Sequence, residues 1–308
     1  MKKTKLFMLT IVVFSLAFAY NCKNEDTTGV GGGGVKPLII PAGTNIAFRD
    51  DFNEGPTPNS FWTLCRPEVT NDNDPAWNRF FKNTEGYECV RVEDGYLKLT
   101  AKKETGSWTN IDKKIGGVLH YKTGGVYSSK NKYGVGTSIK VRAKLYQEEQ
   151  AKTNGFYVPS AFPAIWYYPL YSAPNWPASG EIDIMEWVNI DKEVSYSTLH
   201  YNETNTGKDV YKTSGKTAKI NVADWHVYRC DIYNNNIVIY YDDVEVFKHT
   251  NSGMNYPFNE NFYNIILNAS FQKSWGTPVE EDDSNLPYEL WVDWVEVSLI
   301  DKETGKPL

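Results

Sequence analysis

The chain has 308 residues, 41% of them hydrophobic, and a formal net charge of −6 at pH 7. This length allows one large domain or two small ones with a sizeable core. The sequence contains no block of basic residues, which argues against a nucleic-acid partner. With 10 Trp, 21 Tyr and 14 Phe it is also rich in aromatic side chains, most of which we expect in the core or on strand surfaces.

The beginning of the chain is typical of an export signal followed by a tether. Residues 1–21 combine three lysines among the first five positions with an apolar run of 14 residues, which is too short for a membrane span and fits a signal peptide. Cys22 offers a site for a lipid anchor, and residues 22–45, which include Gly29–Gly34, form a flexible tether. We therefore expect an exported protein, anchored through Cys22 as a cell-surface or periplasmic lipoprotein, or otherwise secreted.

Strand-like runs recur after the tether, separated by Gly, Asn and Asp. They include Tyr96–Ala101, Gly136–Leu145, Glu193–Tyr201, Trp225–Tyr233, Ile237–Tyr241 and Glu289–Leu299. Asn234–Asn236 predicts a hairpin turn, and a short helix is expected around Gln147–Ala151. No long helical period and no internal repeat are present. The pattern predicts an all-β antiparallel sandwich over residues 46–300, followed by a tail at 301–308.

Three cysteines follow the tether, and export would permit a disulfide between two of them. Cys65 and Cys89 could pair with each other, although the sequence does not establish this. Cys230 lies in a strand-like run and is expected to be a buried small hydrophobe. No Cys/His spacing indicates zinc.

Three carboxylates alternate with apolar residues in one predicted strand. Glu181 and Asp183 share one face because side chains alternate along a strand. Glu186 would fall on the opposite face, unless one extra residue is bulged out at Ile184–Met185. An acidic row on a strand costs desolvation and mutual repulsion, so a fold does not need it. A solvated strand face and a Ca²⁺ cluster are the structural alternatives.

Glycoside hydrolysis is a chemistry that needs such acids. One carboxylic acid protonates the leaving oxygen and one carboxylate acts on the other side of the sugar, with a separation of about 5–5.5 Å for retention. With the bulge, Glu181 and Glu186 lie four strand steps apart, roughly 13 Å along the backbone. Their long side chains could close that gap over Asp183, which would separate the two pKa values. The spacing permits a retaining pair.

A series of landmarks in the same order resembles glycoside hydrolase family 16, the laminarinase, lichenase, agarase and carrageenase group, in its bulged Glu-x-Asp-x-x-Glu form. The landmarks are Phe48–Phe52, Phe61–Trp62, Glu93–Leu97, Thr123–Lys130, Val141–Leu145, Phe162–Trp166, Trp176–Pro177, Ser197–Tyr201, Trp225–Tyr228, Ile265–Asn268 and Trp291–Val297. The resemblance implies an antiparallel β-jelly-roll sandwich of the concanavalin A-like lectin/glucanase type, with an open substrate cleft. It also implies endo-acting, retaining hydrolysis of β-linked polysaccharide.

The resemblance assigns roles to the three acids. Glu181 would be the nucleophile, Glu186 the acid/base and Asp183 their modulating partner. No cofactor is required for this chemistry.

Four further side chains are expected to bind substrate. They are Trp166, Trp176, His200 and Trp275. Trp166 and Trp176 lie just before the acids, where aromatic faces could stack on sugar rings, and His200 lies on the strand that follows them. A structural histidine is the alternative for His200.

A structural Ca²⁺ is possible on the side away from the cleft. Asp293 and Gly95 match positions where some family members hold calcium, and Asp51 could supply a third oxygen. Ordinary turn and strand-end roles are the alternative for these three residues.

Several departures from the family pattern bear on the substrate. They are Cys89, Lys140, Ile232 and the Ala-Ser-Phe-Gln-Lys-Ser-Trp run after Asn268. We expect a β-1,3- or mixed β-1,3/1,4-glucan substrate and a monomer. The alternatives are an endo-β-galactanase type of enzyme, acting on agarose, porphyran, carrageenan or host β-galactosyl links, and a noncatalytic glycan-binding module. A transglycosylase would share the three acids.

Overall fold

The computed structural model describes eleven internal stretches and the C-terminal segment of the protein. These are residues 45–65, 89–110, 115–128, 132–169, 177–190, 194–202, 210–213, 220–251, 257–271, 276–277, 279 and 281–308, with the backbone alone described at 105–110, 115–120 and 210–213. The predicted signal peptide, Cys22, Trp176 and Trp275 lie outside these residues, as does all but the last residue of the predicted tether.

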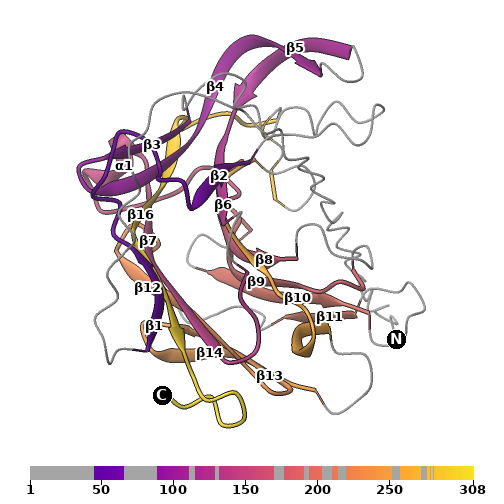
Figure 1. The fold of residues 1–308 in the computed structure, drawn as a ribbon. Helices are drawn as coiled ribbons and strands as arrows, with labels where there is room; N and C mark the ends of the chain where they lie inside the picture. Colours follow the sequence, from indigo (N-terminus) through magenta and orange to yellow (C-terminus); the bar gives the residue numbers. More distant parts are fainter. Residues whose placement is uncertain are drawn as a thin grey trace, which may run out of the picture.

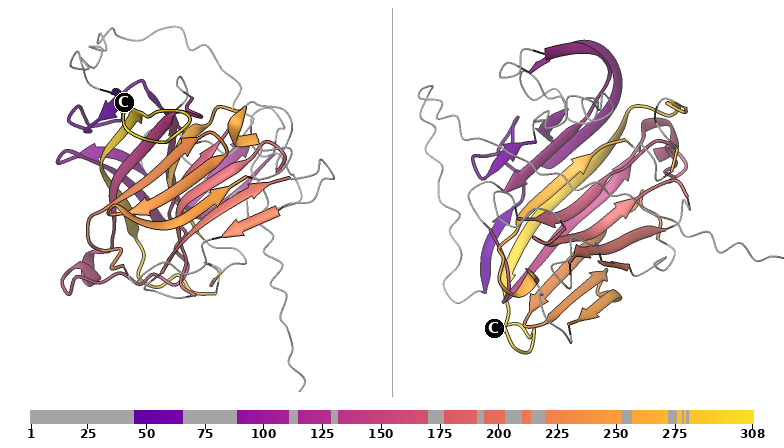
Figure 2. Two further views of the ribbon diagram at one scale, coloured as in Figure 1. Left: turned by 90° about the horizontal axis from the view of Figure 1, so that it is seen from below. Right: turned by 90° about the vertical axis from the view of Figure 1, so that its right-hand side faces the viewer.

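Two antiparallel sheets form two layers (Figures 1 and 2). The nine-stranded sheet has the order β14-β13-β12-β7-β16-β4-β3, with β1 beside β16 and β5 beside β4. Its strands are β1 (Ile46–Asp50), β3 (Val90–Glu93), β4 (Tyr96–Asn110), β5 (Ile115–Lys122), β7 (Thr137–Tyr146), β12 (His226–Tyr233), β13 (Asn236–Tyr241), β14 (Val244–Thr250) and β16 (Tyr288–Leu299). The predicted all-β sandwich is confirmed.

The seven-stranded sheet has the order β11-β10-β9-β8-β15-β6-β2. Its strands are β2 (Trp62–Leu64), β6 (Gly124–Ser128), β8 (Ala164–Tyr168), β9 (Glu181–Trp187), β10 (Ser195–Tyr201), β11 (Val210–Thr213) and β15 (Asn264–Ala269). The strand that carries the three acids, β9, is therefore near the middle of this sheet, with β8 on one side and β10 on the other.

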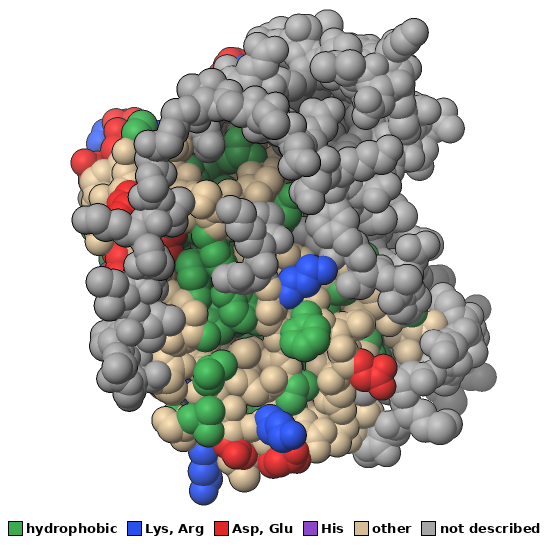
Figure 3. Space-filling view, viewed as in Figure 1, with side chains coloured by type: hydrophobic (Ala, Val, Ile, Leu, Met, Phe, Trp, Pro, Cys, Tyr) green, Lys and Arg blue, Asp and Glu red, His purple; other side chains and the backbone are tan. Residues whose placement is uncertain are grey.

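The hydrophobic core lies between the two sheets. In β7, every second residue from Ile139 to Leu145 faces the core, while Lys140, Arg142 and Lys144 are half-buried on the outer face. This alternation is what one buried face dictates. On the face seen in Figure 1, hydrophobic side chains gather near the centre of the surface and most of the acidic side chains lie toward its edges (Figure 3). By contrast, β9 is buried along its whole length.

The predicted short helix and hairpin turn are confirmed, and the predicted end of one strand is wrong. The short helix α1 spans Glu148–Ala151. The chain turns at Asn234–Asn235 between β12 and β13, where Asn235 adopts a positive φ of 60°. The strand predicted to end at Ala101 continues to Asn110, because β5 pairs with its second half. Among the described residues, no helix is long and apolar enough to cross a membrane.

The three described cysteines, Cys65, Cys89 and Cys230, are all buried. Cys230 lies in the core, as predicted. The pairing of Cys65 with Cys89, both buried, stays a prediction.

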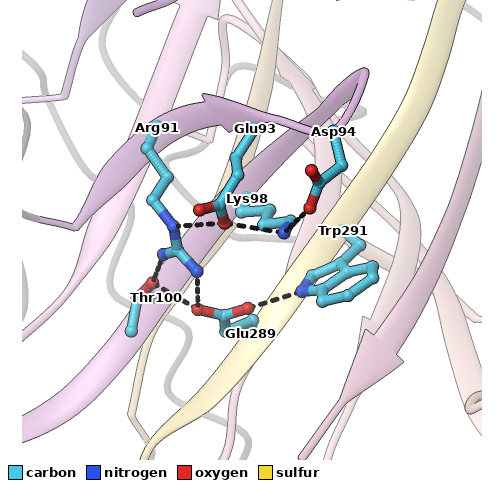
Figure 4. Close-up of polar contacts among 7 residues, drawn as sticks. All are labelled: Arg91, Glu93, Asp94, Lys98, Thr100, Glu289 and Trp291. Carbon is cyan, nitrogen blue, oxygen red and sulfur yellow. Dashed lines mark hydrogen bonds and ion pairs between the residues drawn. The ribbon is translucent and has the colours of Figure 1, made fainter. Parts of the chain in front are cut away.

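A polar network lies on one face of the larger sheet (Figure 4). It links β3, β4 and β16 through Arg91, Glu93, Asp94, Lys98, Thr100, Glu289 and Trp291. The Lys98 ammonium donates to Glu93 and lies 4.4 Å from the centre of the Trp291 ring. These two contacts stabilise the charge of this buried lysine. The network ties the β3–β4 hairpin to β16.

Candidate active site

A β-bulge in β9 brings all three acids to one face of the sheet. Toward β8, Met185 pairs with Ile165 and Asp183 pairs with Trp166, so Ile184 is the extra residue. Toward β10, the register also shifts between the partners of Glu186 and Asp183. The predicted bulge at Ile184–Met185 is therefore confirmed, and without it Glu186 would point to the opposite face.

The strand β10 adds three side chains to the same face. Tyr196, Thr198 and His200 stand opposite Glu186, Asp183 and Glu181, respectively. His200 reaches diagonally, and its Nε2 lies 3.2 Å from Oδ2 of Asp183. One ligand atom from each of Glu181, Asp183 and His200 lies within 4.8 Å of the others. His200 therefore belongs to the acid cluster, which sequence order alone left open.

Burial and neighbouring charges control the protonation of Glu186. Glu181, Asp183 and Glu186 are only 7%, 3% and 9% exposed. Burial raises the pKa of Glu186 well above its ordinary value, and the negative charge of Asp183 raises it further. The charge of His200 and a hydrogen bond with Thr198 act in the opposite direction. The surroundings of Glu186 thus favour its protonated form, as a general acid requires.

The strand β8 presents an aromatic wall next to the acids. Trp166 stands opposite Asp183, and its indole N–H donates to Oδ1 of Asn268 at 2.8 Å. Tyr168, two residues further along β8, has its ring centre 6.2 Å from that of Trp166. The structure therefore places Trp166 on the face of the acids, while Trp176 and Trp275 lie outside the described residues.

Thr198, Tyr168 and Asn268 are site residues that the sequence analysis did not assign. Alternation along a strand would have indicated Thr198, two positions before His200, and Tyr168, two positions after Trp166. Asn268 had no comparable signal, because its contact with Trp166 depends on the pairing of β15 with β8.

The three residues considered for calcium have other partners. Oδ1 of Asp51 lies 2.7 Å from Nη2 of Arg49, and the carboxylate of Asp293 is paired with Arg142. Gly95 occupies the turn between β3 and β4 with a φ of 78°. A cation that bound either carboxylate would have to compete with its guanidinium partner. Calcium binding stays a prediction.

Glu181, Asp183 and His200 are also near enough to one another to share a divalent cation. Metal binding would therefore compete with a catalytic role of the same three side chains in hydrolysis. Hydrolysis needs Glu186 as a proton donor, whereas a cation held by Glu181, Asp183 and His200 does not need it.

The structure thus places a buried row of carboxylates on one strand of a two-layer antiparallel sandwich, an arrangement that glycoside hydrolysis can use. Residues 153–261, which include the row, match the XgeA-like catalytic domain of glycoside hydrolase family 16. A solved structure of the endo-acting O-glycanases with which prominent members of the human gut microbiota initiate mucin breakdown is 35% identical, with a TM-score of 0.68 over 83% of this chain and 100% of that one.

Two relatives of similar sequence are also named as endo-acting glycosidases. The keratan-sulfate endo-1,4-β-galactosidase of Sphingobacterium multivorum is 25% identical over 96% of this chain and 68% of its own. The glucan endo-1,3-β-glucosidase A1 of Niallia circulans is 26% identical over 83% of this chain but only 38% of its own. The chain belongs to glycoside hydrolase family 16. It is a retaining enzyme that cleaves O-glycosyl bonds.

Proposed function

We propose that this protein is an exported, monomeric endo-β-glycosidase that cleaves β-galactosyl links within host glycans of the mucin or keratan type. The single observation that carries the substrate class is the similarity to an endo-acting O-glycanase of mucin breakdown, which is 35% identical and is matched over its whole length. The β-galactosidase that acts on keratan sulfate points the same way. These relatives favour the galactosyl alternative over the β-glucan expected from the sequence.

The geometry supports a role for each acid. Glu181 attacks the anomeric carbon while Glu186 donates its proton to the leaving glycosidic oxygen. The bond between the anomeric carbon and that oxygen breaks, which gives a glycosyl ester on Glu181. Glu186 then takes a proton from water, which attacks the same carbon and releases Glu181. Asp183, which lies between them with His200 at 3.2 Å, keeps a proton on Glu186 during the first step.

A product screen tests this function. The purified protein is incubated with mucin O-glycans, keratan sulfate, laminarin and lichenan, beside its Glu186→Gln variant. Oligosaccharides from mucin or keratan, absent with the variant, support the proposal, and NMR of the first products should show the retained anomer. Binding without products from any polymer would favour a glycan-binding module, and an excess of transfer products would favour a transglycosylase.

The β-glucan remains a second candidate, favoured by the glucan endo-1,3-β-glucosidase relative. Products from laminarin or lichenan, with none from mucin or keratan, would establish it in place of the host glycan.

The export proposal rests on the N-terminal sequence, with its lysines, its apolar run and Cys22. Its test is fractionation of cells that express the full chain or the Cys22→Ala variant. The lipid-anchor proposal expects the full chain in the membrane fraction and the variant in the soluble fraction. A variant that stays with the membranes would contradict it.

A further inference from the structure

The bulged residue of β9, Ile184, has no place in the register of the sheet. Ile184 has no register partner on either β8 or β10. It is completely buried in the core between the sheets. A buried carbonyl without a hydrogen bond is costly, so this oxygen needs a donor from outside the normal ladder.

Two hydroxyl groups supply that donor. Oγ of Ser197 donates to the Ile184 carbonyl oxygen at 2.8 Å, and Oη of Tyr241 donates to the same oxygen at 3.0 Å. The two hydroxyl oxygens are 3.1 Å apart. A carbonyl oxygen has two lone pairs and can accept both bonds. Ser197 and Tyr241 together therefore satisfy the group that the bulge exposes.

The two donors come from different layers of the sandwich. Ser197 lies on β10, directly beside the bulge in the smaller sheet. Tyr241 is the last residue of β13 in the larger sheet, where its ring packs edge-on against Tyr228 with centres 4.9 Å apart. The hydroxyl of Tyr241 thus crosses the core and ties the bulge to the opposing sheet.

The bulge determines where Glu186 points, since a regular strand would turn that side chain to the core face. We propose that Ser197 and Tyr241 are positioning residues, which hold the bulge at Ile184 and so keep Glu186 on the catalytic face beside Asp183. This inference rests on the proposed role of Glu186 as acid/base. It assigns a catalytic purpose to two hydroxyl groups that do not share the face of the acids.

Removal of the hydroxyls tests the proposal. Ser197→Ala and Tyr241→Phe each leave one bond to Ile184, so each should lower kcat by about fivefold, and the double variant by about 100-fold. KM should stay within about twofold, because the lost interaction serves the transition state rather than binding. A loosened bulge also moves Glu186 away from Asp183 and admits water, so the alkaline limb of the pH profile should shift to lower pH.

Tyr167→Phe is the matched control. Tyr167 lies on the adjacent strand β8, is completely buried, and its hydroxyl has no hydrogen-bond partner among the described residues. Its variant should keep both kcat and the pH profile. Equal losses in the control and in the test variants would mean that any buried hydroxyl matters in the same way, and would overturn the proposal.

Deletion of Ile184 provides an independent arm. The deletion pairs Met185 with Ile165 and Asp183 with Trp166 without a gap, so alternation alone should put Glu186 on the face of the acids. In this background, Ser197→Ala and Tyr241→Phe should cost less than about twofold in kcat, because no bulge remains to be held. A loss as large as in the parent chain would show that the hydroxyls act in some other way.

The outcomes separate this inference from the proposed function. If Glu186→Gln is fully active, the acid/base assignment fails, whatever the hydroxyl variants do. If Glu186→Gln is inactive but the Ser197→Ala and Tyr241→Phe variants match the parent chain, only the positioning role fails. If the double variant does not fold, the two single variants decide, and unchanged kcat in both would refute the role.

Discussion

Replacement of Glu186 by Gln is the sharpest test of the site, because it removes a proton and little else. The side chain is nearly isosteric and stays next to Thr198, which hydrogen-bonds the carboxylate in the parent chain. The buried surroundings that hold the proton on Glu186 are unchanged. The variant therefore isolates proton donation from positioning and packing.

The expected loss follows from the task assigned to this group. General acid catalysis contributes roughly 10²–10⁴-fold in rate, or about 2.7–5.4 kcal/mol of barrier. A sugar is a poor leaving group, so the full loss should appear on the natural glycan. An aryl glycoside with an acidic phenol needs no proton, so formation of the glycosyl-enzyme from it should be nearly as fast as in the parent chain.

The pH profile gives a second readout with a definite sign. The pKa of Glu186 is raised well above its ordinary value by burial and by Asp183, so kcat/KM of the parent chain should fall on the alkaline side as Glu186 ionises. The Gln variant has nothing to titrate there and should lose that limb. A variant with more than a tenth of the parent activity on the glycan, or with the same alkaline limb, would refute the assignment.

Stability should change in the opposite direction from activity. A carboxyl group whose pKa is raised by folding favours the folded state fully below its unfolded pKa, and this contribution is lost as the pH rises through the folded pKa. The direction of the Glu186 shift therefore predicts that the parent chain loses stability across that window. Glu186→Gln should melt at a progressively higher temperature than the parent as the pH rises from about 4.3. A constant difference between the two melting temperatures would contradict the shift.

Three further predictions concern the support of the site. Trp166→Phe removes the indole donor to Asn268, so the free energy of unfolding should fall by about 1–3 kcal/mol and KM on the glycan should rise; unchanged values would show that this bond has no role. Gly180→Ala should destabilise the folded protein by about 1–3 kcal/mol in a thermal melt, because the φ of Gly180 is 83° and a Cβ there would lie 2.8 Å from the Tyr263 hydroxyl. Gly155→Ala serves as the control, since the nearest atom to its Cβ would be 3.7 Å away. Saturating Ca²⁺ at 100 times its dissociation constant should add about 2.7 kcal/mol if the predicted calcium site exists, and identical melts in Ca²⁺ and EDTA would argue against it.

The acid row could be predicted from sequence because it is a local pattern. Glu181, Asp183 and Glu186 lie within one strand, so alternation plus one bulged residue was enough to put them on one face. Trp166 and His200 were assigned because they lie just before and just after the acids in the chain, within landmarks that resemble the family. The α1 helix and the β12–β13 turn could also be predicted, because their signals are local.

The sequence by itself thus determined the family, the sandwich class and the identity of the acids, because these depend on residues near one another in the chain and on the order of the landmarks. Only the tertiary structure showed that the surroundings of Glu186 favour its protonated form, since its burial and its closeness to Asp183 and His200 depend on the pairing of β9 with its neighbours. It alone showed that Tyr241, from the other sheet, reaches the carbonyl of Ile184. That contact joins segments far apart in the chain, and no periodicity in either segment encodes it.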